Sequence, residues 1–538
     1  MEKQGKWAAP FLVGMMPLIP LAYLYARNAD YLSAGQVAAV GGAMVLVSLI
    51  GYGLFRAVFR ARFAALMGCL TGWVFFFAMR GASNLPVFQL DRVGFDGFLL
   101  RYGALALVGT LIVPLITRRL RGGQLYPILL IFFSVLLAYN GFIAVKTGVS
   151  MEFHAMAADK VVYKTRFEAA QNAPSPNVYW IHCDAMLGFD AFETYFGDDQ
   201  AEFAQGLAER GFSINRGAML EAFHQTRYAV PALMCPSFYD SLLQPVLKDH
   251  ETAMAQAPLL SLDALDTARL KNETRLAFEQ KGYLSQTFGS ISIYYPPVSD
   301  RVYSTGDTSA FLLETDERFK EKYLSVLEAG ELTTLMTGMP NGTYLNLVMK
   351  LSARGLLPFE MKRSALQHDL TDGEIAALSG GKKLQRKTDM MLGAINDSTY
   401  ADQPTFDIVF YLGAHSPFVL DENGDPNPGD HYAVASYAPQ HRYAADMLII
   451  MIDEILERDP DAVIVLQADH GLHQNTAAEI TQAFGEDAVE PLWNQVLSAL
   501  RVPEKYQTGE ERHALENPLN MSRYLVNTFV GKNYDYVQ

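Results

Sequence analysis

A carboxylate and an imidazole stand side by side at Asp469 and His470, directly after an apolar run that begins at Ala462. The run is rich in β-branched residues, which is typical of a buried parallel strand. Open α/β sheets bind ligands at the carboxyl ends of their strands, and Asp beside His is a suitable pair of ligands for a divalent metal ion. An ordinary polar turn before Gly471 explains the pattern equally well, so other segments must decide.

Two further apolar runs also end in polar side chains. Residues 177–183 read N-V-Y-W-I-H-C and precede Asp184, and residues 406–412 lead into His415. If all three runs are parallel strands of one sheet, their carboxyl ends share an edge and these side chains converge. Two carboxylates and an imidazole suit zinc or manganese and leave room for one more ligand. This convergence favours a metal site over a set of ordinary turns.

The candidate nucleophile is Thr226, in the segment F-H-Q-T-R at residues 223–227. A threonine hydroxyl is a weak nucleophile near neutral pH, but a divalent ion lowers its pKa and orients it toward an electrophilic phosphorus. If Thr226 opens a helix, the backbone N–H groups of the first turn would stabilise phosphoryl oxygens. A threonine before a helical stretch is, taken alone, usually an N-cap.

The elements that position these groups alternate between strand and helix, which predicts an α/β domain with a mostly parallel central sheet flanked by helices. Helical spacing is found over residues 199–210, 227–234 and 443–458, and a short strand is predicted over 212–215. The region between residues 241 and 404 is less regular. There the pattern predicts helices over 262–282 and 316–356 and a strand over 291–295.

Five apolar segments precede this domain, at residues 7–26, 36–55, 63–79, 102–117 and 125–145. Each is near the length of about 20 residues that crosses the hydrocarbon core of a membrane as a helix. Basic residues mark the N-terminus and alternate loops, so the N-terminus is expected in the cytoplasm and the C-terminal part outside it. We expect a transmembrane domain at residues 1–149, a juxtamembrane linker at 150–173 and an extracytoplasmic catalytic domain at 174–538.

Composition excludes some classes of function. The 538 residues include 43 basic and 58 acidic side chains, and this net charge of -15 disfavours a nucleic-acid partner. The cysteines Cys69, Cys183 and Cys235 are too few for a disulfide framework, and Cys69 and Cys183 are expected to be small buried side chains. The apolar segments carry no acidic residue at their centres, which disfavours an ion transporter.

The ordered motifs resemble the sulfatase-type branch of the alkaline phosphatase superfamily, and more narrowly the bacterial membrane enzymes related to lipoteichoic acid synthases and phosphoethanolamine transferases. After five membrane segments, the motifs are P-N-V-Y-W-I-H-C-D-A-M at 176–186, H-Q-T-R at 224–227, H-S-P-F at 415–418 and Q-A-D-H-G at 467–471. The resemblance covers the whole chain in outline and is poorest in the middle third. It implies a bundle of five transmembrane helices followed by an alkaline-phosphatase-like (sulfatase) domain.

The resemblance also implies the site residues. The residues expected to hold one divalent ion, Mn²⁺ or Zn²⁺ with Mg²⁺ as a further option, are Asp184, Thr226, Asp469 and His470. Thr226 would be the catalytic nucleophile, and His415 would contact the substrate phosphate or protonate the leaving group. His473 would supply a second imidazole toward the substrate, with a surface histidine as the alternative. Many of the synthases and transferases have Glu at the position of Asp184.

The activity implied is phosphotransfer in a bacterial inner membrane. Thr226 would attack a phospholipid donor, release diacylglycerol and form a phosphothreonine. A cell-envelope glycan or lipid acceptor would then take the phosphoglycerol or phosphoethanolamine type group. The alternatives are a hydrolase of the same fold, acting on phosphodiesters or sulfates, and a non-catalytic lipid-binding regulator. Sulfatases use C-x-P-x-R, whereas here Pro236 follows Cys235 directly and Tyr239 stands where Arg is expected, which disfavours sulfatase activity.

Overall fold

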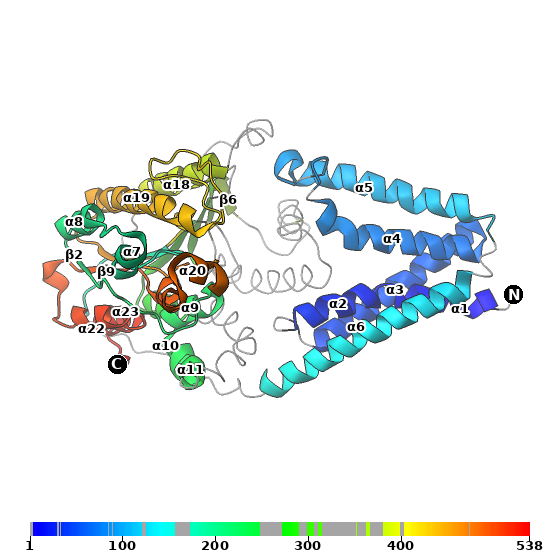
Figure 1. The fold of residues 1–538 in the computed structure, drawn as a ribbon, viewed down its shortest axis with the longest axis horizontal. Helices are drawn as coiled ribbons and strands as arrows, with labels where there is room; N and C mark the ends of the chain where they lie inside the picture. The colour runs from blue at the N-terminus through cyan, green and yellow to red at the C-terminus, as the bar shows by residue number, and fades with distance from the viewer. Residues whose placement is uncertain are drawn as a thin grey trace. The chain divides into compact units, whose positions relative to one another are not determined.

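The chain divides into two compact units, one containing the N-terminal 157 residues and the other most of the chain from residue 158 onward. Each unit is described by itself (Figure 1). The computed structural model describes residues 4–29, 32, 34–83, 85–88, 90–120, 125–155, 173–247, 272–289, 299–305, 310–314, 351, 362–365, 380–398, 403–472 and 474–538.

The N-terminal unit is a bundle of apolar helices. Its helices are α1 Gln4–Met15, α2 Leu18–Arg27, α3 Ala34–Phe59, α4 Arg62–Ala82, α5 Leu90–Thr117 and α6 Leu125–Ala155. Within the described residues, five segments are long and apolar enough to span a membrane, Trp7–Arg27, Ala34–Phe59, Arg62–Ala82, Asp96–Thr117 and Leu125–Gly148. The five predicted segments are thereby confirmed as apolar helices.

The first predicted segment differs in one detail, because it is two helices rather than one. Helix α1 ends at Met15 and α2 begins at Leu18. Pro17 lies between them, and a proline has no N–H with which to continue the helical hydrogen bonds.

Glycines allow close packing between α4 and α5. A Cβ atom at Gly109 would lie 2.6 Å from the ring of Phe75, and one at Gly68 would lie 2.9 Å from Pro114. Because no side chain larger than hydrogen fits at either position without a shift, the two helices depend on these glycines for their contact.

The C-terminal unit is built on a mixed sheet. The described residues form nine strands in the order β2-β9-β8-β1-β7-β3-β4-β5-β6. The five strands from β8 to β4 run parallel, and antiparallel strands lie on either side of them. The strands are β1 Val178–Cys183, β2 Phe212–Ile214, β3 Leu284–Gly289, β4 Arg301–Thr305, β5 Ala310–Glu314, β6 Lys362–Ala365, β7 Thr405–Tyr411, β8 Val463–Gln467 and β9 Ser498–Arg501. The predicted α/β fold class with a mostly parallel sheet is confirmed.

The register of the three central strands aligns their carboxyl ends. His182 near the end of β1 pairs with Phe410 in β7 and with Gln467 in β8. Every residue of these three strands is buried, which explains their continuous apolar runs. The loops that follow them, which carry Asp184, His415 and Asp469, therefore begin at the same edge of the sheet.

Helices cover both faces of the sheet. Figure 1 shows α18 and α19 on one side and α22 and α23 on the other. The α-helices of this unit are α7 Phe189–Phe196, α8 Ala201–Glu209, α9 Thr226–Met234, α10 Pro236–Phe238, α11 Gln244–Leu247, α14 Glu273–Gln280, α18 Gly380–Asp397, α19 Tyr437–Arg458, α20 Ala477–Phe484, α21 Val489–Asn494, α22 Glu511–Glu516 and α23 Asn520–Leu525. Short π- and 3₁₀-helical turns are η2 Tyr239–Leu243, η4 Val434–Ser436, η5 Glu486–Ala488, η6 Glu504–Tyr506 and η7 Val526–Val530.

Most predicted elements of this unit agree with the structure, and the middle region agrees least. The helix predicted over 262–282 is described only from Asn272, whose side chain caps α14 by accepting a hydrogen bond from the Arg275 N–H. Helix α14 ends at Gln280, before the predicted end. The strand predicted over 291–295 lies outside the described residues, as does the helix predicted over 316–356 apart from residue 351.

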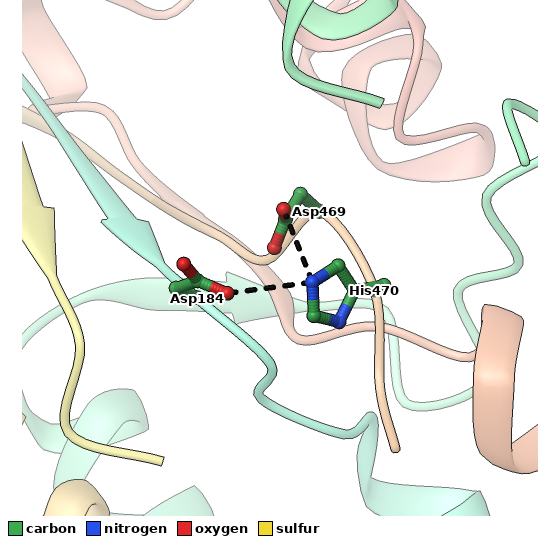
Figure 2. Close-up of side chains that lie close together, drawn as sticks. All are labelled: Asp184, Asp469 and His470. Atoms are coloured by element: carbon green, nitrogen blue, oxygen red, sulfur yellow. Dashed lines mark ion pairs between the residues drawn. The ribbon is translucent and has the colours of Figure 1, made fainter. Parts of the chain in front are cut away.

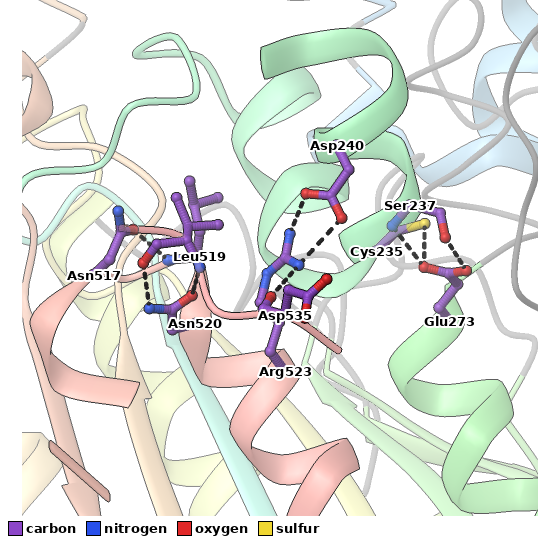
Figure 3. A network of polar contacts seen from close by, with 10 residues as sticks. Cys235, Ser237, Asp240, Glu273, Asn517, Leu519, Asn520, Arg523 and Asp535 are labelled. Carbon is purple, nitrogen blue, oxygen red and sulfur yellow. Dashed lines mark hydrogen bonds and ion pairs between the residues drawn. The ribbon is translucent and has the colours of Figure 1, made fainter. Parts of the chain in front are cut away.

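A network of polar contacts holds the residues that follow α9 against the start of α14 and the C-terminal segment (Figure 3). The carboxylate of Glu273, at the start of α14, accepts hydrogen bonds from the Ser237 N–H at 2.8 Å, the Ser237 hydroxyl at 2.6 Å and the Cys235 thiol at 3.3 Å. Arg523 bonds to the Asp240 carboxylate at 2.6 Å and to the Asp535 carbonyl at 2.8 Å. The segment just beyond α9 is thereby held from two sides.

Candidate metal centre

Asp184, Asp469 and His470 converge at the edge of the sheet that the sequence predicts (Figure 2). All three are buried, and one ligand atom from each lies within 4.8 Å of those of the other two. Nε2 of His470 lies 3.4 Å from Oδ1 of Asp184 and 3.4 Å from Oδ2 of Asp469. The three side chains point toward one another from the loops after β1 and β8.

The turn that carries Asp184 is strained and firmly held. Ala185 has a φ of 63°, a left-handed conformation that non-glycine residues adopt at an energetic cost. The hydroxyl of Tyr437 donates to the Ala185 carbonyl at 2.8 Å and accepts from the Leu187 N–H at 3.0 Å. Strain of this kind persists only where surrounding contacts hold it, and it is concentrated at functional sites. Tyr437 thus fixes the direction of the Asp184 side chain.

The loop after β8 needs glycine directly after the Asp469–His470 pair. A Cβ atom on Gly471 would lie 2.3 Å from the Leu492 carbonyl oxygen and 2.4 Å from Leu187. The Gly471 N–H donates to the Trp493 carbonyl at 2.8 Å. The Gly that the sequence places after His470 is therefore required for close backbone packing.

The ring of His470 is oriented for coordination. Its Nδ1 lies 2.9 Å from the carbonyl oxygen of Gly471. A carbonyl can only accept, so Nδ1 carries the proton and Nε2 of the neutral ring presents a lone pair. Fixing the far nitrogen in this way is how proteins orient histidines that bind metals.

Thr226 completes the cluster. It is the first residue of α9, and its Oγ1 lies 3.2 Å from Nε2 of His470. Phe223, three residues earlier, has a φ of 56°, so a second left-handed residue lies next to the site. The structure therefore brings Thr226 together with the three predicted metal ligands and places it at a helix N-terminus.

The electrostatics of the cluster call for a cation. Burial, followed by the charge of Asp469, raises the pKa of Asp184 well above its usual value. Burial alone would also raise the pKa of Asp469, but His470 and His182 and the hydrogen bonds that it accepts hold its pKa below the usual value. The two carboxylates cannot both be ionised in this buried space without a compensating positive charge.

The donor set fits a divalent metal ion. Asp184 Oδ1 and Asp469 Oδ2 are buried, and neither has a hydrogen-bond donor among the described residues. These are the two oxygens that face Nε2 of His470. Two carboxylate oxygens, an imidazole nitrogen and a hydroxyl within one small volume match the ligand types of zinc and manganese sites.

Two histidines near the cluster were not predicted. Nε2 of His182 lies 3.2 Å from Oδ1 of Asp469, and His182 is the only imidazole in β1, whose sequence is V-Y-W-I-H-C. His224 stacks on Trp493 with ring centroids 4.1 Å apart, and burial, followed by His470, lowers its pKa to about 4. A histidine within an otherwise apolar strand, two residues before the predicted ligand Asp184, is the signal that could have identified His182.

His415 lies beside the cluster and does not join its ligand atoms. Its ring centroid is 6.5 Å from that of His470, and the side chain is half-buried. Nδ1 of His415 lies 2.5 Å from the Ser416 carbonyl oxygen, and Gln440 donates to the His415 carbonyl at 3.0 Å. Neither contact involves Nε2 of His415. His473, the other predicted substrate contact, lies outside the described residues.

Cys235, which belongs to the segment compared with the sulfatase motif, is buried. Burial, followed by Glu273, raises the pKa of its thiol well above the usual value. Cys69 and Cys183 are also buried and in no disulfide, as expected from the sequence.

Comparison with known proteins found no matching protein-family model and no matching curated protein. Among solved structures, the chain is similar to the C-terminal periplasmic domain of EcEptC from Escherichia coli in complex with Zn, with 12% identity, coverage of 69% of this chain and 86% of that chain, and a TM-score of 0.37. It is also similar to the integral membrane lipooligosaccharide phosphoethanolamine transferase A (EptA) from Neisseria meningitidis, with 11% identity, coverage of 97% and 95%, and a TM-score of 0.36. A third is BT1596, a 2-O GAG sulfatase, with 12% identity, coverage of 67% and 72%, and a TM-score of 0.33.

Phosphoethanolamine transferases and sulfatases are the kinds of protein that the sequence motifs resemble.

Proposed function

We propose that the chain is a metal-dependent phosphotransferase in which Thr226 is the nucleophile. The observation that carries this proposal is the 3.2 Å distance between Thr226 Oγ1 and His470 Nε2, in a buried cluster with two carboxylates. The N-cap of α9 is Gln225, so helix capping does not account for the position of Thr226 among these groups.

The residues that would hold the ion are Asp184, Thr226, Asp469 and His470. A divalent ion bound there would lower the pKa of the Thr226 hydroxyl and offset the negative charge of phosphoryl oxygens. Because Thr226 is the first residue of α9, unpaired N–H groups at the start of this helix would stabilise the same oxygens.

The reaction that these residues support has two displacements. The Thr226 oxygen forms a bond to the phosphorus of a phosphodiester, and the bond from phosphorus to the leaving alcohol breaks. Nε2 of His415 would take the proton that the Thr226 hydroxyl loses and pass it to the leaving alkoxide. The hydroxyl of an acceptor then attacks the phosphothreonine, and the Thr226 oxygen recovers a proton.

The membrane helices support a phospholipid donor. A catalytic domain at residues 174–538, joined to the membrane domain through the segment that follows α6, would meet lipids at high effective concentration. The donor would be a phospholipid, and the acceptor a glycan or lipid of a bacterial cell envelope. The group moved would be of the phosphoglycerol or phosphoethanolamine type, on the extracytoplasmic side of the inner membrane.

The test is intact mass and peptide mapping of the full-length protein in lipid nanodiscs, incubated with headgroup-labelled phosphatidylglycerol or phosphatidylethanolamine and with Mn²⁺ or Zn²⁺. We expect a headgroup-phosphate adduct on residue 226, present in the unmodified protein and in Thr226→Ser and absent from Thr226→Ala. Thr481→Ala is the matched control because Thr481 is exposed on α20.

The other outcomes separate the alternatives. Release of several equivalents of diacylglycerol per protein without any acceptor would identify a hydrolase, because forming the phosphothreonine releases only one. Protein that holds its metal but forms no adduct and releases no diacylglycerol would exclude both donors. Protein that binds no divalent ion would support the non-catalytic regulator instead.

A further inference from the structure

A cavity of about 590 Å³ lies in the N-terminal unit between helices α2, α3 and α6. This volume falls within the range of roughly 300–1,000 Å³ that is typical of ligand pockets. It is separate from the candidate metal centre, because every residue that lines it belongs to the membrane helices.

The lining of this membrane pocket is apolar. It consists of aliphatic side chains and glycines, with the hydroxyl of Tyr25 as its single side-chain polar group. Two of the glycines, Gly42 on α3 and Gly141 on α6, have no atom within 4 Å of the place where a Cβ would stand. The pocket thus exists partly because these two positions carry no side chain.

The lining residues lie at one level of the bundle. On the first span, Trp7–Arg27, they begin at Leu18, and on α6 they begin at Leu137, so both sets belong to the second half of the span. On α3 they lie between Ala34 and Val45, in the first half. Since α6 leads onward to the second unit, the pocket lies in the half of the bundle where the chain leaves the membrane unit. In a bilayer this half corresponds to one leaflet.

Two cations lie near the same end of the pocket. Arg27, the last residue of α2, is two residues beyond the lining residue Tyr25, and Arg27 lies 4.6 Å from the ring centroid of Tyr23. Lys146 is exposed on α6 between the lining residues Val145 and Gly148. Positive side chains at the end of a membrane helix lie at the level of lipid phosphates.

We propose that the membrane pocket binds one acyl chain of a phospholipid from that leaflet, with the lipid phosphate near Arg27 and Lys146. An acyl chain is the apolar ligand that surrounds these helices at the highest concentration. A helix from a second copy fits less well, because a helix with its side chains is about 10 Å across, so this volume holds little more than one turn of about 5.4 Å. The proposal concerns the membrane unit alone and stands whether or not the proposed function does.

The test uses the full-length protein in vesicles of phosphatidylethanolamine and phosphatidylglycerol that contain a phosphatidylethanolamine with a diazirine at the end of one acyl chain. After illumination, labelled peptides are mapped by mass spectrometry. Gly141→Leu and Gly42→Leu fill the pocket from two different helices. Gly103→Leu on α5 is the matched control, since a Cβ there also has no atom within 4 Å and Gly103 does not line the pocket.

We expect the label to concentrate on lining peptides of α2, α3 and α6, and to fall several-fold there in both filling variants but not in Gly103→Leu. Labelling spread evenly over all the membrane helices would overturn the proposal, as would an unchanged level in the two filling variants. Cross-linked dimers joined through α3 and α6 and absent in Gly141→Leu would overturn the proposal, because they would show that a second copy of the chain occupies the pocket. Thermal midpoints of all variants establish that the comparison is between folded proteins, and two filling positions keep the test decisive if one variant misfolds.

Discussion

Oγ1 of Thr226 and Nε2 of His470 lie 3.2 Å apart although the two residues are separated by 244 positions in the sequence. Helix α9 begins at Thr226, and His470 lies in the loop that follows β8. The start of the helix and the end of the strand are therefore close in space. Since Nδ1 of His470 faces the Gly471 carbonyl, only Nε2 can face the hydroxyl. Contacts within the protein therefore set the orientation of this pair.

His182→Ala is expected to weaken the binding of Zn²⁺ or Mn²⁺ by about 10–100-fold, the usual effect of losing a side chain that orients a metal ligand. Nε2 of His182 lies 3.2 Å from Oδ1 of Asp469, and the other oxygen, Oδ2, faces His470. Equilibrium dialysis against a competing chelator measures the change. His513→Ala is the control, because His513 is partly exposed on α22 and contacts Glu516. Equal affinities in all three proteins would show that His182 does not position Asp469.

Tyr437→Phe is expected to lower both thermal stability and metal affinity. It would remove the hydroxyl that pairs with the Ala185 carbonyl and the Leu187 N–H, and leaving buried groups unpaired costs about 1–3 kcal/mol. Thermal unfolding with and without metal separates the two effects. Tyr432→Phe, at a side chain that is 63% exposed, is the matched control. A variant with a lower thermal midpoint but wild-type metal affinity would limit Tyr437 to a structural role.

The sequence predicts the parts of this fold in which apolar runs are continuous. Strands β1, β7 and β8 are buried throughout, so each is visible as an apolar run that ends at a polar residue. Their shared edge follows from parallel pairing, and with it the convergence of Asp184, Asp469 and His470.

Strand β3 could not be predicted in the same way. It reads L-S-Q-T-F-G, with Ser285, Gln286 and Thr287 all buried. Their side chains are satisfied by hydrogen bonds to residues distant in sequence or in the next loop, such as the 2.9 Å bond from Gln286 to Asp407 and the 2.7 Å contact of Thr287 with Ser299. Burial of polar side chains depends on such partners, which periodicity does not reveal.

Stability is expected to fall as the pH rises between about 4 and about 7 because of Asp407. Burial raises the pKa of Asp407 to about 7, although Gln286 and Thr405 donate hydrogen bonds to its carboxylate. In this range the folded protein keeps a proton that the unfolded chain has lost, so the free energy of unfolding decreases by about 1.4 kcal/mol per pH unit. Below this range both states are protonated, and above it the loss is complete.

Asp407→Asn should remove this contribution, because an amide does not ionise and can still accept from Gln286. Thermal midpoints at pH 5 and pH 8 should therefore differ less in Asp407→Asn than in the unmodified protein. Asp397→Asn, at an exposed position on α18, should behave like the unmodified protein. The same pH dependence in Asp407→Asn would mean that another group is responsible.

Cys235→Ala is expected to leave phosphotransfer within about twofold of the unmodified protein while lowering the thermal midpoint. The thiol is buried, its pKa is raised, and it contacts the Glu273 carboxylate, so it is protonated at neutral pH and is not the thiolate that nucleophilic catalysis needs. Losing this contact removes one hydrogen bond to a charged group, a cost of about 1.5–3 kcal/mol. Phosphothreonine formation and thermal unfolding measure the two effects on one preparation.

The accessibility of the thiol supplies an independent readout. Maleimide should modify Cys235 only after denaturation, since all three cysteines are buried in the folded protein. Loss of all activity in a Cys235→Ala protein that retains its metal and its fold would mean that the cysteine takes part in the chemistry. That result would favour a sulfatase-like mechanism, because the Cys-Pro pair would then be more than the structural contact to Glu273 that Figure 3 shows.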